Sequence, residues 1–563
     1  MEVSLLVRSL LAKRGVESDE HIAAFLEPDY ERGTHDPFLL EGMERAVSRL
    51  LSAIAQGERI AVYADFDCDG IPGAVVLSDF FRKIGYKNFE VYLPHRDREG
   101  YGFHKEAIAQ LASNNVSLII TVDVGTTAID AVQFANERGV DVIVTDHHEV
   151  NGVLPDALAV INPKLGPPAG GYPFRDLCGA AVAWKLVQAT LTEGKKRNAS
   201  NFSVIPDGWE KWLLDMVAIA TIADMVPLVD ENRVLSHFGL KVLRKSPRPG
   251  IIALCNRLRL RRAELTEDDI AFSIAPRVNA ASRMDEPDAA LKLLSTENPE
   301  EAEALVAHLE QLNTRRKGVV AVVVRQARKN MRERFGDSEQ VVVLGNPEWK
   351  PAILGLAANS IMEDRGGVVC LWGRDANGNL KGSCRSDGNI SIAELFANAG
   401  DVFDAAGGHA NSGGFSVSHE NVHALPEILT RAASSLSGAV LQNTDKNDVT
   451  PDLLVSLSEL SSAFFADVSL LAPFGIGNPK PILSVCETTV TEVKRFGRDS
   501  AHVELRLECR RSGVRMRAFD FFRAPEGFTL TPEAGTEARV LATIGRDSFR
   551  GGLALRIVDV VSV

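Results

Sequence analysis

The chain has 563 residues, of which 45% are hydrophobic and 24% are charged. That length fits about three or four domains, and this composition is typical of a globular protein with hydrophobic cores. No apolar run is long enough to span a bilayer, and the net charge of −13 disfavours a nucleic-acid-binding surface that covers the whole chain.

The N-terminal residues 1–15 are typical of an amphipathic helix and not of a secretory signal, because charged residues interrupt the Leu and Val positions. The seven cysteines are odd in number and include no Cys-x-x-Cys pair. This usage favours a reducing cytoplasm and disfavours both a disulfide framework and a zinc ribbon. We therefore expect a cytoplasmic protein that does not bind a membrane.

Basic residues are unevenly distributed along this acidic chain. The segments 241–262, 315–334 and 494–517 each contain eight Lys or Arg residues and at most three acids. A single run of this kind is usually a solvated face. Three such runs in an acidic chain predict local patches for a polyanion, separate from the acidic motifs.

The first strand is predicted at Ile60–Ala64, and three alternating aspartates follow it: Asp65, Asp67 and Asp69. Carboxylates with this period lie on one side of an extended chain, where each raises the pKa of the others. A hard divalent cation relieves that repulsion. The pattern also opens an EF-hand loop, but the twelfth position, which needs a bidentate Glu, is Val76. A solvated acidic turn remains the alternative for this segment alone.

Strands and helices alternate from residue 59 to residue 162. Short Val- and Ile-rich runs separated by helical stretches are typical of a parallel sheet that is covered on both faces. Further strands are predicted at Phe89–Leu93, Leu118–Val122, Asp141–Thr145 and Leu158–Ile161, and helices at Gly73–Ile84, Lys105–Ala112 and Thr127–Glu137. Sites in such sheets form at the carboxyl ends of the strands.

Acids and histidines follow several of these apolar segments. They are Asp123 after the strand at 118–122, the triplet Asp146, His147 and His148 after the strand at 141–145, and Asp224 after the apolar helix that begins at Met216. An isolated His147 or Asp224 would more often be structural. Together with the three alternating aspartates, these residues predict carboxylates and imidazoles that meet at one edge of the sheet.

The second half of the chain begins with a helical stretch, 299–335, whose basic second half suggests a connector between domains. A second α/β unit follows, with strands near Val341–Leu344, Val368–Trp372 and Leu380–Cys384. In the segments Gly382–Ser386 and Gly407–Gly414, glycines would let backbone N–H groups approach a phosphate closely.

Residues 437–452 are polar and predict a linker. Beyond Pro473, alternating segments at Val503–Cys509, Val514–Phe519 and Leu553–Val558, with glycine turns between them, predict a small barrel of the oligonucleotide-binding (OB) type. Its aromatic residues either fill the core or stack on bases, and the candidates for stacking are Phe519, Phe521, Phe522 and Phe549.

The predicted fold class is α/β, followed by a C-terminal β-barrel. We expect a parallel-sheet catalytic domain with an N-terminal helical segment over residues 1–310, a connecting helix over 311–335, a smaller α/β domain over 336–440 and an OB-like nucleic-acid-binding domain over 450–563. The acidic motifs fall in the first of these parts, and the glycine-rich motifs fall in the third.

Taken in order, the motifs resemble those of the DHH phosphoesterase superfamily. The segments that carry the resemblance are Asp65–Gly70, Asp123–Gly125, Asp146–His148, Ala223–Asp224, Pro276–Arg283, Gly382–Arg385, Gly407–His409 and Pro473–Pro479. The ordered set extends over almost the whole chain and is similar to the RecJ family, which combines DHH, DHHA1 and OB domains. Members of that family are single-strand-specific 5′→3′ DNA exonucleases of bacteria.

The resemblance implies a role for each matching residue. Two divalent ions, Mn²⁺ or Mg²⁺, would be held by Asp65, Asp67, Asp69, Asp123, His147 and Asp224, with His148 in or beside that shell. Two ions about 4 Å apart would activate a water molecule and stabilise the leaving oxygen at phosphorus. The terminal and scissile phosphates would be bound by Arg96, Tyr101, Arg277, Asn279, Arg283, Ser383, Arg385 and His409.

Three positions depart from the family pattern. Ile71-Pro72 replaces small or hydroxylic residues, Lys350 replaces a histidine, and Ser412-Gly413 replaces a more apolar pair. None of these departures removes a metal ligand. They leave substrate preference and the details of the phosphate contacts open.

The function that the resemblance implies is metal-dependent removal of 5′ mononucleotides from single-stranded DNA in recombination and DNA repair. The expected protein partners are a helicase and a single-strand-binding protein, and the expected state is a monomer. One alternative is a DHH phosphodiesterase for short oligonucleotides or cyclic dinucleotides, which would not need the β-rich domain after Pro473. Another is a non-catalytic single-strand-binding replication scaffold, which predicts decayed carboxylates.

Overall fold

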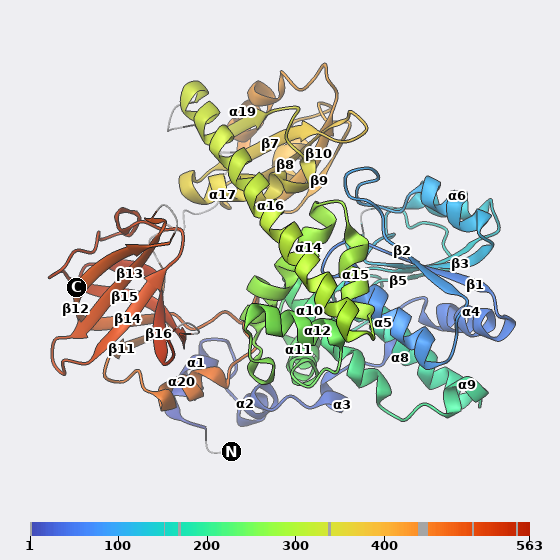
Figure 1. Ribbon diagram of the computed structural model, residues 1–563, viewed down its shortest axis with the longest axis horizontal. Helices are drawn as coiled ribbons and strands as arrows, with labels where there is room; N and C mark the ends of the chain where they lie inside the picture. The colour runs from blue at the N-terminus through green and yellow to red at the C-terminus, as the bar shows by residue number, and fades with distance from the viewer. Residues whose placement is uncertain are drawn as a thin grey trace. The chain divides into compact units, whose positions relative to one another are not determined.

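The computed structural model describes residues 3–150, 152–166, 171–335, 339–436, 449–497, 500–547 and 550–563. The chain forms two compact units, whose elements are labelled in Figure 1. The larger unit contains residues 35–226 and 238–443, and the smaller unit contains residues 1–34, 227–237 and 444–563. The N-terminal residues therefore cluster with the C-terminal strands, although they are far apart in sequence.

The larger unit contains a parallel five-stranded sheet. Its strands are β1 (Arg59–Ala64), β2 (Phe89–Tyr92), β3 (Val116–Val122), β4 (Asp141–Thr145) and β5 (Ala159–Ile161). They lie in the order β2-β1-β3-β4-β5, so the chain runs from β1 to β2 on one side and returns to the other side of β1 at β3. Open α/β sheets bind ligands at such a reversal, outside the carboxyl ends of the strands.

Helices cover both faces of this sheet, as strands that are buried on both sides require. On one face, α6 (Lys105–Ser113) and α7 (Ile129–Asn136) share a hydrophobic core with β1, β3 and β4. The opposite layer contains α5 (Gly70–Lys83) and α8 (Gly179–Lys196), against which α4 (Met43–Gln56) and α10 (Leu214–Ala223) pack. The predicted strands and helices of this region are confirmed, and their ends differ by at most three residues from the expected ones.

A helical region links the first sheet to the second. It contains α11 (Asp230–Leu243), α12 (Pro249–Leu258), α13 (Glu267–Asp269), α14 (Ala275–Arg283), α15 (Pro287–Ser295) and α16 (Pro299–Arg334). The connector α16 has 36 residues and begins at Pro299, after Asn298 as N-cap, so it starts well before residue 311. It packs on α12, α14 and α15, and also on α17 (Pro351–Arg365) beside the second sheet.

The second sheet of the larger unit is mixed. In spatial order its strands are β6 (Val341–Gly345), β7 (Val368–Arg374), β8 (Leu380–Ser386), β10 (Ser412–Val417) and β9 (Ala405–Gly408). Only β6 and β7 are parallel. Helices α18 (Ile392–Asn398) and α19 (Leu425–Leu436) contribute to its core. The smaller α/β domain and its three predicted strands are confirmed.

Cys370 and Cys384 form a disulfide between β7 and β8. The two residues stand directly opposite each other in this antiparallel pair. Cysteine usage disfavoured a disulfide framework, so this bridge was not predicted. Their separation of 14 residues in the sequence gave no indication of it, because the pairing depends on strand register.

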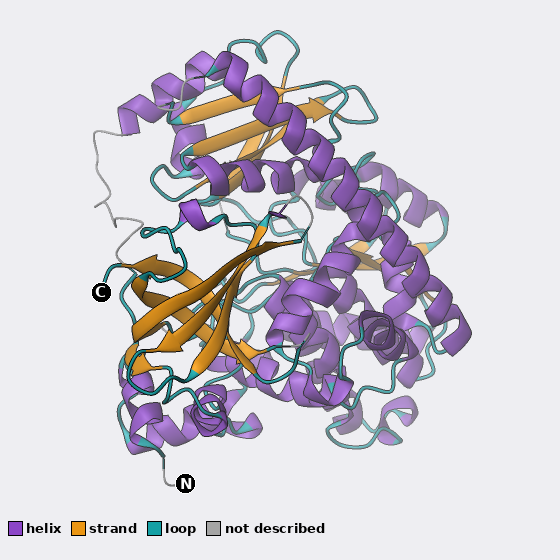
Figure 2. Ribbon diagram, turned by 60° about the vertical axis from the view of Figure 1, so that its left-hand side comes forward, coloured by secondary structure: helices purple, strands orange, loops and turns teal. Residues whose placement is uncertain are grey.

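The smaller unit contains a closed β-barrel, whose curved strands are seen in Figure 2. Its strands pair in the order β12 (Leu483–Phe496), β13 (His502–Cys509), β14 (Arg515–Asp520), β16 (Leu553–Val561) and β15 (Glu537–Arg546). Pairing of β15 with β12 closes the barrel, and β11 (Leu453–Ser456) adds to β12 at its edge. The predicted barrel is confirmed. Phe549 and most of the predicted linker at 437–452 lie outside the described residues.

Short helices complete both units. In the smaller unit, α1 (Leu5–Ala12), α2 (Asp19–Leu26) and α20 (Ser462–Ser469) share one hydrophobic core with the barrel, and α3 (Tyr30–Gly33) follows α2. The larger unit also contains α9 (Ser200–Ser203), 3-10 helices at Pro37–Leu39, Trp209–Leu213 and Arg262–Glu264, and a π-helical turn at Ile270–Ile274. The smaller unit contains a further 3-10 helix at Pro525–Gly527. Within the described ranges, no helix is long and apolar enough to cross a membrane.

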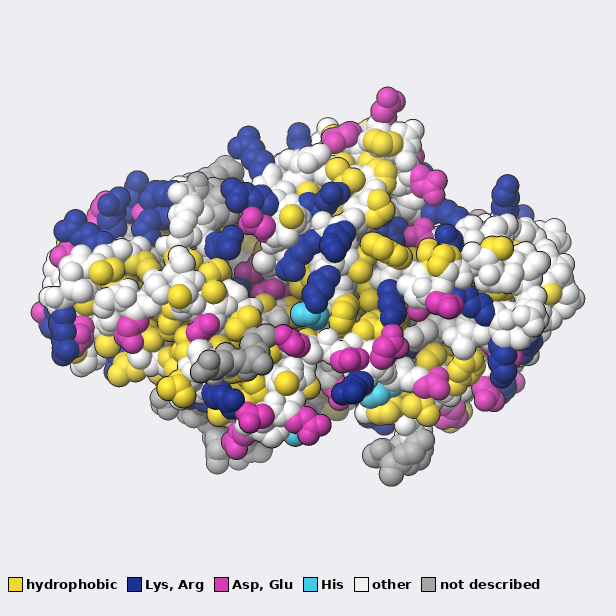
Figure 3. Space-filling view, turned by 90° about the horizontal axis from the view of Figure 1, so that it is seen from below, with side chains coloured by type: hydrophobic (Ala, Val, Ile, Leu, Met, Phe, Trp, Pro, Cys, Tyr) yellow, Lys and Arg dark blue, Asp and Glu magenta, His cyan; other side chains and the backbone are white. Residues whose placement is uncertain are grey.

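The three basic runs differ in their partners. In the first, Arg248 is largely buried and binds Asp215 at 2.8 Å and Asp79 at 2.6 Å. In the third, six arginines pair with acids of the barrel: Arg495, Arg506, Arg510, Arg511, Arg515 and Arg517. On the face drawn in Figure 3, basic side chains gather in patches among acidic ones. In the second run, Arg328 pairs with Asp364, so all three runs are partly neutralised within the fold.

Replacing Arg248 by Ala should destabilise the larger unit, because the buried carboxylate of Asp215 then loses its positive partner. Breaking a buried ion pair in this way costs about 3–5 kcal/mol. We expect the midpoint of urea unfolding to fall accordingly. The control Arg257→Ala truncates an exposed arginine of α12, the helix that follows Arg248, and should leave the midpoint unchanged. Equal midpoints for the two variants would contradict a stabilising role of Arg248.

Candidate metal centre and phosphate-binding residues

Three aspartates lie on the loop between β1 and α5, at the reversal of the strand order. The N–H of Asp65 donates to the carbonyl of Val122 at 3.0 Å and so continues the pairing of β1 with β3. Oδ1 of Asp67 accepts from the N–H groups of Asp69 (2.8 Å) and Gly70 (3.2 Å). A Cβ at residue 70 would lie 2.3 Å from the Asp65 carbonyl oxygen, so this tight return of the chain requires glycine.

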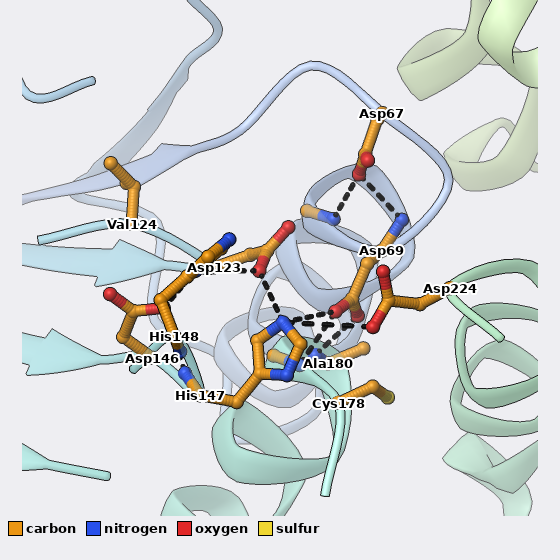
Figure 4. Close-up of polar contacts among 12 residues, drawn as sticks. Asp67, Asp69, Asp123, Val124, Asp146, His147, His148, Cys178, Ala180 and Asp224 are labelled. Carbon is orange, nitrogen blue, oxygen red and sulfur yellow. Dashed lines mark hydrogen bonds and ion pairs between the residues drawn. The ribbon is translucent and has the colours of Figure 1, made fainter. Parts of the chain in front are cut away.

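The next two strands bring an acid and an imidazole to the same edge. Asp123 follows β3, donates its N–H to the carbonyl of Thr145 at 2.9 Å, and has a φ of 61°, which Asp tolerates better than most residues. Nε2 of His147 lies 3.0 Å from Asp123 Oδ1, 3.6 Å from Asp69 Oδ2 and 3.7 Å from Asp224 Oδ2 (Figure 4). Carboxylates from three separate segments thus surround one imidazole nitrogen.

The six expected metal ligands form two groups of donor atoms. One group is Asp69, His147 and Asp224, and the other is Asp65, Asp67 and Asp123. Within each group, one ligand atom per residue lies within 4.8 Å of the others. A third group, Asp123, His147 and His148, joins the first two. Two connected groups of oxygen and nitrogen donors suit two neighbouring divalent ions.

The charges of this cluster also fit a metal centre. Burial, and then repulsion from neighbouring acids, raises the pKa of Asp65 and Asp123 well above the usual value, that of Asp69 to about 7 and that of Asp224 to about 9. Oδ1 of Asp65 and Oδ1 of Asp123 are buried without a hydrogen-bond donor. Divalent cations would satisfy these oxygens and remove the repulsion.

Backbone amides at the start of α8 hold Asp69 from the other side. The N–H groups of Gly179 and Ala180 donate to its two carboxylate oxygens at 2.6 and 2.7 Å. A Cβ at residue 179 would lie 2.6 Å from the Cβ of Asp123, so α8 approaches both acids through a glycine. Sequence reasoning missed this contact, and its only signal is the run of small residues after Cys178.

Asp146 lies outside the donor groups and orients the two histidines that follow it. Its Oδ1 accepts from the N–H of His147 and from Nδ1 of His148, both at 2.7 Å, and its Oδ2 accepts from the N–H of Thr126 at 2.8 Å. Burial disfavours the charged form of Asp146, but the hydrogen bond with His148 outweighs this effect and holds the pKa of Asp146 below its usual range. Sequence reasoning named Asp146 only as part of the motif and did not assign it this role.

The two histidines differ in charge because of these contacts. Burial, and then the charge of the nearby His148, lower the pKa of His147 to about 3, which leaves a neutral imidazole able to bind a metal. Burial also disfavours charge on His148, but the carboxylate of Asp146 outweighs it and raises the pKa of His148 to about 9. The hydroxyl of Tyr101 lies 3.2 Å from Nδ1 of His148, which places Tyr101 beside the donor groups.

Three of the predicted phosphate-binding residues, Arg96, Arg283 and Arg385, form a cluster of like charge. Burial, and then the charges of Arg96, Arg316 and Arg385, lower the pKa of Arg283 to about 9. Burial and the charge of Arg96 also lower the pKa of Arg385. Within the described part of the chain, none of the three pairs with a carboxylate. Unpaired guanidinium groups that repel one another fit a phosphate anion.

Two further predicted phosphate contacts bind other protein groups. Arg277 forms an ion pair with Glu310 on α16. Oδ1 of Asn279 accepts from the N–H of Cys68 at 2.9 Å. Because Cys68 lies between two aspartates of the metal loop, Asn279 fixes that loop, a role that the sequence motif did not suggest.

The last two predicted phosphate contacts come from the second sheet. Ser383 lies on β8 opposite Gly414 of β10. His409 is exposed in the turn between β9 and β10. A hydrogen bond from Lys164, with a smaller contribution from the charge of His409, lowers the pKa of Glu149, so His409 lies near the segment that follows the two histidines.

Comparison with known proteins agrees with this architecture. Family models match residues 59–221 (DHH family, N-terminal domain), 338–437 (DHHA1 domain) and 451–559 (RecJ OB domain). The single-stranded-DNA-specific exonuclease RecJ of Bacillus subtilis (strain 168) is 33% identical over 529 residues, 94% of this chain but 64% of that protein. The chain therefore spans slightly less than two thirds of that relative's length.

Two further comparisons extend the similarity. The single-stranded-DNA-specific exonuclease RecJ of Escherichia coli (strain K12) is 31% identical over 497 residues, 85% of this chain and 83% of that protein. The crystal structure of RecJ in complex with Mn²⁺ from Thermus thermophilus covers 100% of this chain and 76% of that chain, with 27% identity and a TM-score of 0.78. Fold and site together define a protein of the DHH class. The chain belongs to the RecJ family, which confirms the resemblance seen in the sequence.

Replacing Gly179 by Ala should weaken metal binding, because the new Cβ would lie 2.6 Å from the Cβ and 2.9 Å from the Cα of Asp123 and must displace that residue. Disturbing groups that position metal ligands typically weakens metal affinity about 10–100-fold. The measurement is the dissociation constant for Mn²⁺, determined by isothermal titration calorimetry. Gly318→Ala is the control, because a Cβ there meets nothing within 4 Å. An unchanged Mn²⁺ affinity in the Gly179 variant would argue against this geometry.

Proposed function

We propose that the chain is a metal-dependent exonuclease that removes 5′ mononucleotides from single-stranded DNA in recombination and repair. The observation that carries this proposal is the meeting of two connected carboxylate–imidazole donor groups at the reversal of a parallel sheet. The RecJ relatives, which share its domains, are named as single-stranded-DNA-specific exonucleases. A non-catalytic scaffold would not need these donors, since their mutual repulsion costs stability without a cation.

The donor set suits Mn²⁺ or Mg²⁺, which prefer carboxylate oxygens and accept imidazole. Asp65, Asp67, Asp69, Asp123, His147 and Asp224 would hold two such ions, with His148 beside them. Such a pair would supply activation of a water molecule and stabilisation of the leaving oxygen of a phosphodiester. Around them, Asp146 fixes the orientation of the histidines and Asn279 fixes the loop that carries three of the acids.

The phosphates of the strand bind to the cluster of Arg96, Arg283 and Arg385. The further contacts are Tyr101, Arg277, Asn279, Ser383 and His409. Guanidinium groups bind phosphate oxygens in a bidentate manner, and a phosphate would relieve the repulsion among the three arginines. This cluster distinguishes a phosphodiester substrate from a small uncharged one.

The barrel binds the strand at a second place. There the ring of His502 lies 5.2 Å from that of Phe521 and 4.7 Å from that of Phe522, between ring centroids. Arg556 lies 4.4 Å from the centroid of Phe521, and Phe522 is 82% exposed. A cluster of aromatic rings that includes an exposed one and lies beside an arginine is suited to stacking on bases.

The proposed domain division follows these roles: a catalytic domain over residues 1–310, a connecting segment over 311–335, a DHHA1 domain over 336–440 and a strand-binding OB domain over 450–563. Within this division, residues 1–34 cluster with the smaller unit, and the connecting segment is the C-terminal part of α16. The protein acts as a monomer in the cytoplasm. Because its substrate arises when duplex DNA is opened and is covered by binding proteins, a helicase and a single-strand-binding protein deliver it.

Replacing Asp123 by Asn should reduce digestion of 5′-labelled single strands more than about 100-fold, because this residue belongs to two of the donor groups. The melting temperature should not fall, since the variant removes a buried charge from a repulsive cluster. Asp130→Asn, which changes an exposed acid of α7, is the control. Undiminished Mn²⁺-dependent digestion by the Asp123 variant would refute the proposed site.

Replacing Phe522 by Ala should weaken binding to long single strands, because the loss of one stacked base costs roughly 1–3 kcal/mol. Cleavage of a trinucleotide should be less affected, because the larger unit by itself carries the metal donors and the arginine cluster. The measurements are strand affinity by fluorescence anisotropy and turnover of the trinucleotide. Val514→Ala, at a partly exposed residue of the same barrel, should change neither. Unchanged affinity in the Phe522 variant would exclude stacking on this ring.

A further inference from the structure

Residues 95–100 form a loop within the segment that joins β2 to α6. We call it the arginine loop because it carries Arg96. The carbonyl of His95 accepts from three successive N–H groups, those of residues 98–100, at 2.8–3.2 Å. The guanidinium carbon of Arg96 lies 4.9 Å from the ring centroid of Phe66, the residue between two aspartates of the metal loop. The arginine loop therefore places a cation directly beside the metal centre.

Glu99 closes this loop with both of its carboxylate oxygens. Oε1 accepts from the hydroxyl of Tyr92 at 2.7 Å, and Oε2 accepts from the N–H of His95 at 2.7 Å. Tyr92 ends β2, and its ring stacks on that of Tyr63 in β1 at 5.4 Å. Glu99 thus connects the arginine loop to the sheet that carries the metal loop, although it touches none of the metal ligands.

The arginine loop has further contacts outside the first sheet. Asp285, which follows α14, lies 3.3 Å from Nδ1 of His95 and 3.6 Å from Nε of Arg98. From the turn between β7 and β8 of the second sheet, Nδ2 of Asn377 donates to the carbonyl of Arg98 at 2.7 Å. Lys350, at the start of α17, lies 3.9 Å from Asp97. The loop is therefore held from both α/β regions of the larger unit.

These contacts hold the arginine loop in place against the electrostatic force that acts on Arg96. Arg96 lies close enough to Arg283 and Arg385 for their charges to repel one another. Without a substrate phosphate between them, Arg283 and Arg385 repel the guanidinium of Arg96 while Asp65 and Asp67 attract it, so an unbalanced electrostatic force acts on this side chain. A short loop fixed at both of its ends and on both sides can resist that force, whereas a free loop cannot.

We propose that Glu99 is a positioning residue for Arg96, and that Asn377 is its counterpart on the second sheet. Glu99 fixes the loop against β2, and Asn377 fixes it against the region that supplies Arg385. Together they keep Arg96 where a phosphate can bind it and its neighbours at once. This inference rests on the proposed role of Arg96 in binding the substrate phosphate.

The test is a double-mutant cycle on kcat/KM with single-stranded DNA. We expect Glu99→Ala to lower kcat/KM about 10-fold in the wild-type background and to have no further effect when Arg96 is already Met, because the two changes remove the same interaction. Tyr92→Phe removes one of the two bonds of Glu99 and keeps the packing on Tyr63, so it should give a smaller loss of the same kind.

Asn377→Ala should lower kcat/KM about 3-fold in the wild-type background and not in the Arg96→Met background. Asn389→Ala is the matched control, since this exposed Asn of the second α/β region bonds only within its own turn and should change nothing. Glu99→Gln keeps one acceptor and should recover part of the activity that Glu99→Ala loses.

An equal loss from Glu99→Ala in both backgrounds would show that Glu99 merely stabilises the fold, and would overturn the inference. Full activity of Glu99→Ala, or of Arg96→Met alone, would overturn it as well. Neither result would affect the proposed exonuclease function, because the Asp123→Asn variant tests the metal centre separately.

Discussion

The repulsion among buried carboxylates is the constraint on which the rest of the site depends. Asp65, Asp69 and Asp123 are buried side by side at the carboxyl edge of one sheet, and Asp224 approaches them from the end of a helix. Water cannot screen these charges, so they must either take up protons or bind cations. The structure provides too few hydrogen-bond donors to hold them as anions, since Oδ1 of Asp65 has no donor and Oδ1 of Asp123 forms no hydrogen bond, although Nε2 of His147 lies 3.0 Å away. A pair of divalent ions would neutralise these carboxylates and remove their mutual repulsion.

The fold brings the acids together through its topology and through two close approaches. The reversal of strand order between β1 and β3 opens the sheet edge where Asp65 and Asp123 emerge. Gly70 lets α5 start directly over Asp65, and Gly179 lets α8 start directly against Asp123. Among the proposed phosphate-binding residues the like charges are positive, because Arg96, Arg283 and Arg385 lie close enough to repel one another. Both clusters are costly by themselves, and a phosphodiester with bound metal ions would neutralise them together.

Much of this could be predicted from the sequence. The strands around the acidic motifs are short apolar runs, so their positions and the edge at which Asp65, Asp123 and His147 meet followed from periodicity. The ordered motifs then indicated the family. Local pattern also predicted the barrel, since alternation from Val503 to Cys509 is a property of neighbouring residues.

Other features depend on contacts between distant segments, which a single sequence does not reveal. The disulfide of Cys370 with Cys384 depends on strand register, and the neutralised basic run at 494–517 depends on which acids lie across the barrel. The family resemblance implied a phosphate contact for Asn279, but it did not reveal that Oδ1 of this residue binds the backbone of the metal loop. The bonds of Asp69 to the start of α8 join residues that are 110 positions apart.

The most direct test of the central claim is anomalous X-ray diffraction from crystals of the protein grown with Mn²⁺. The account predicts two anomalous peaks, one among Asp69, His147 and Asp224 and the other among Asp65, Asp67 and Asp123. Crystals that contain Mn²⁺ but show no anomalous peak among these side chains would contradict it.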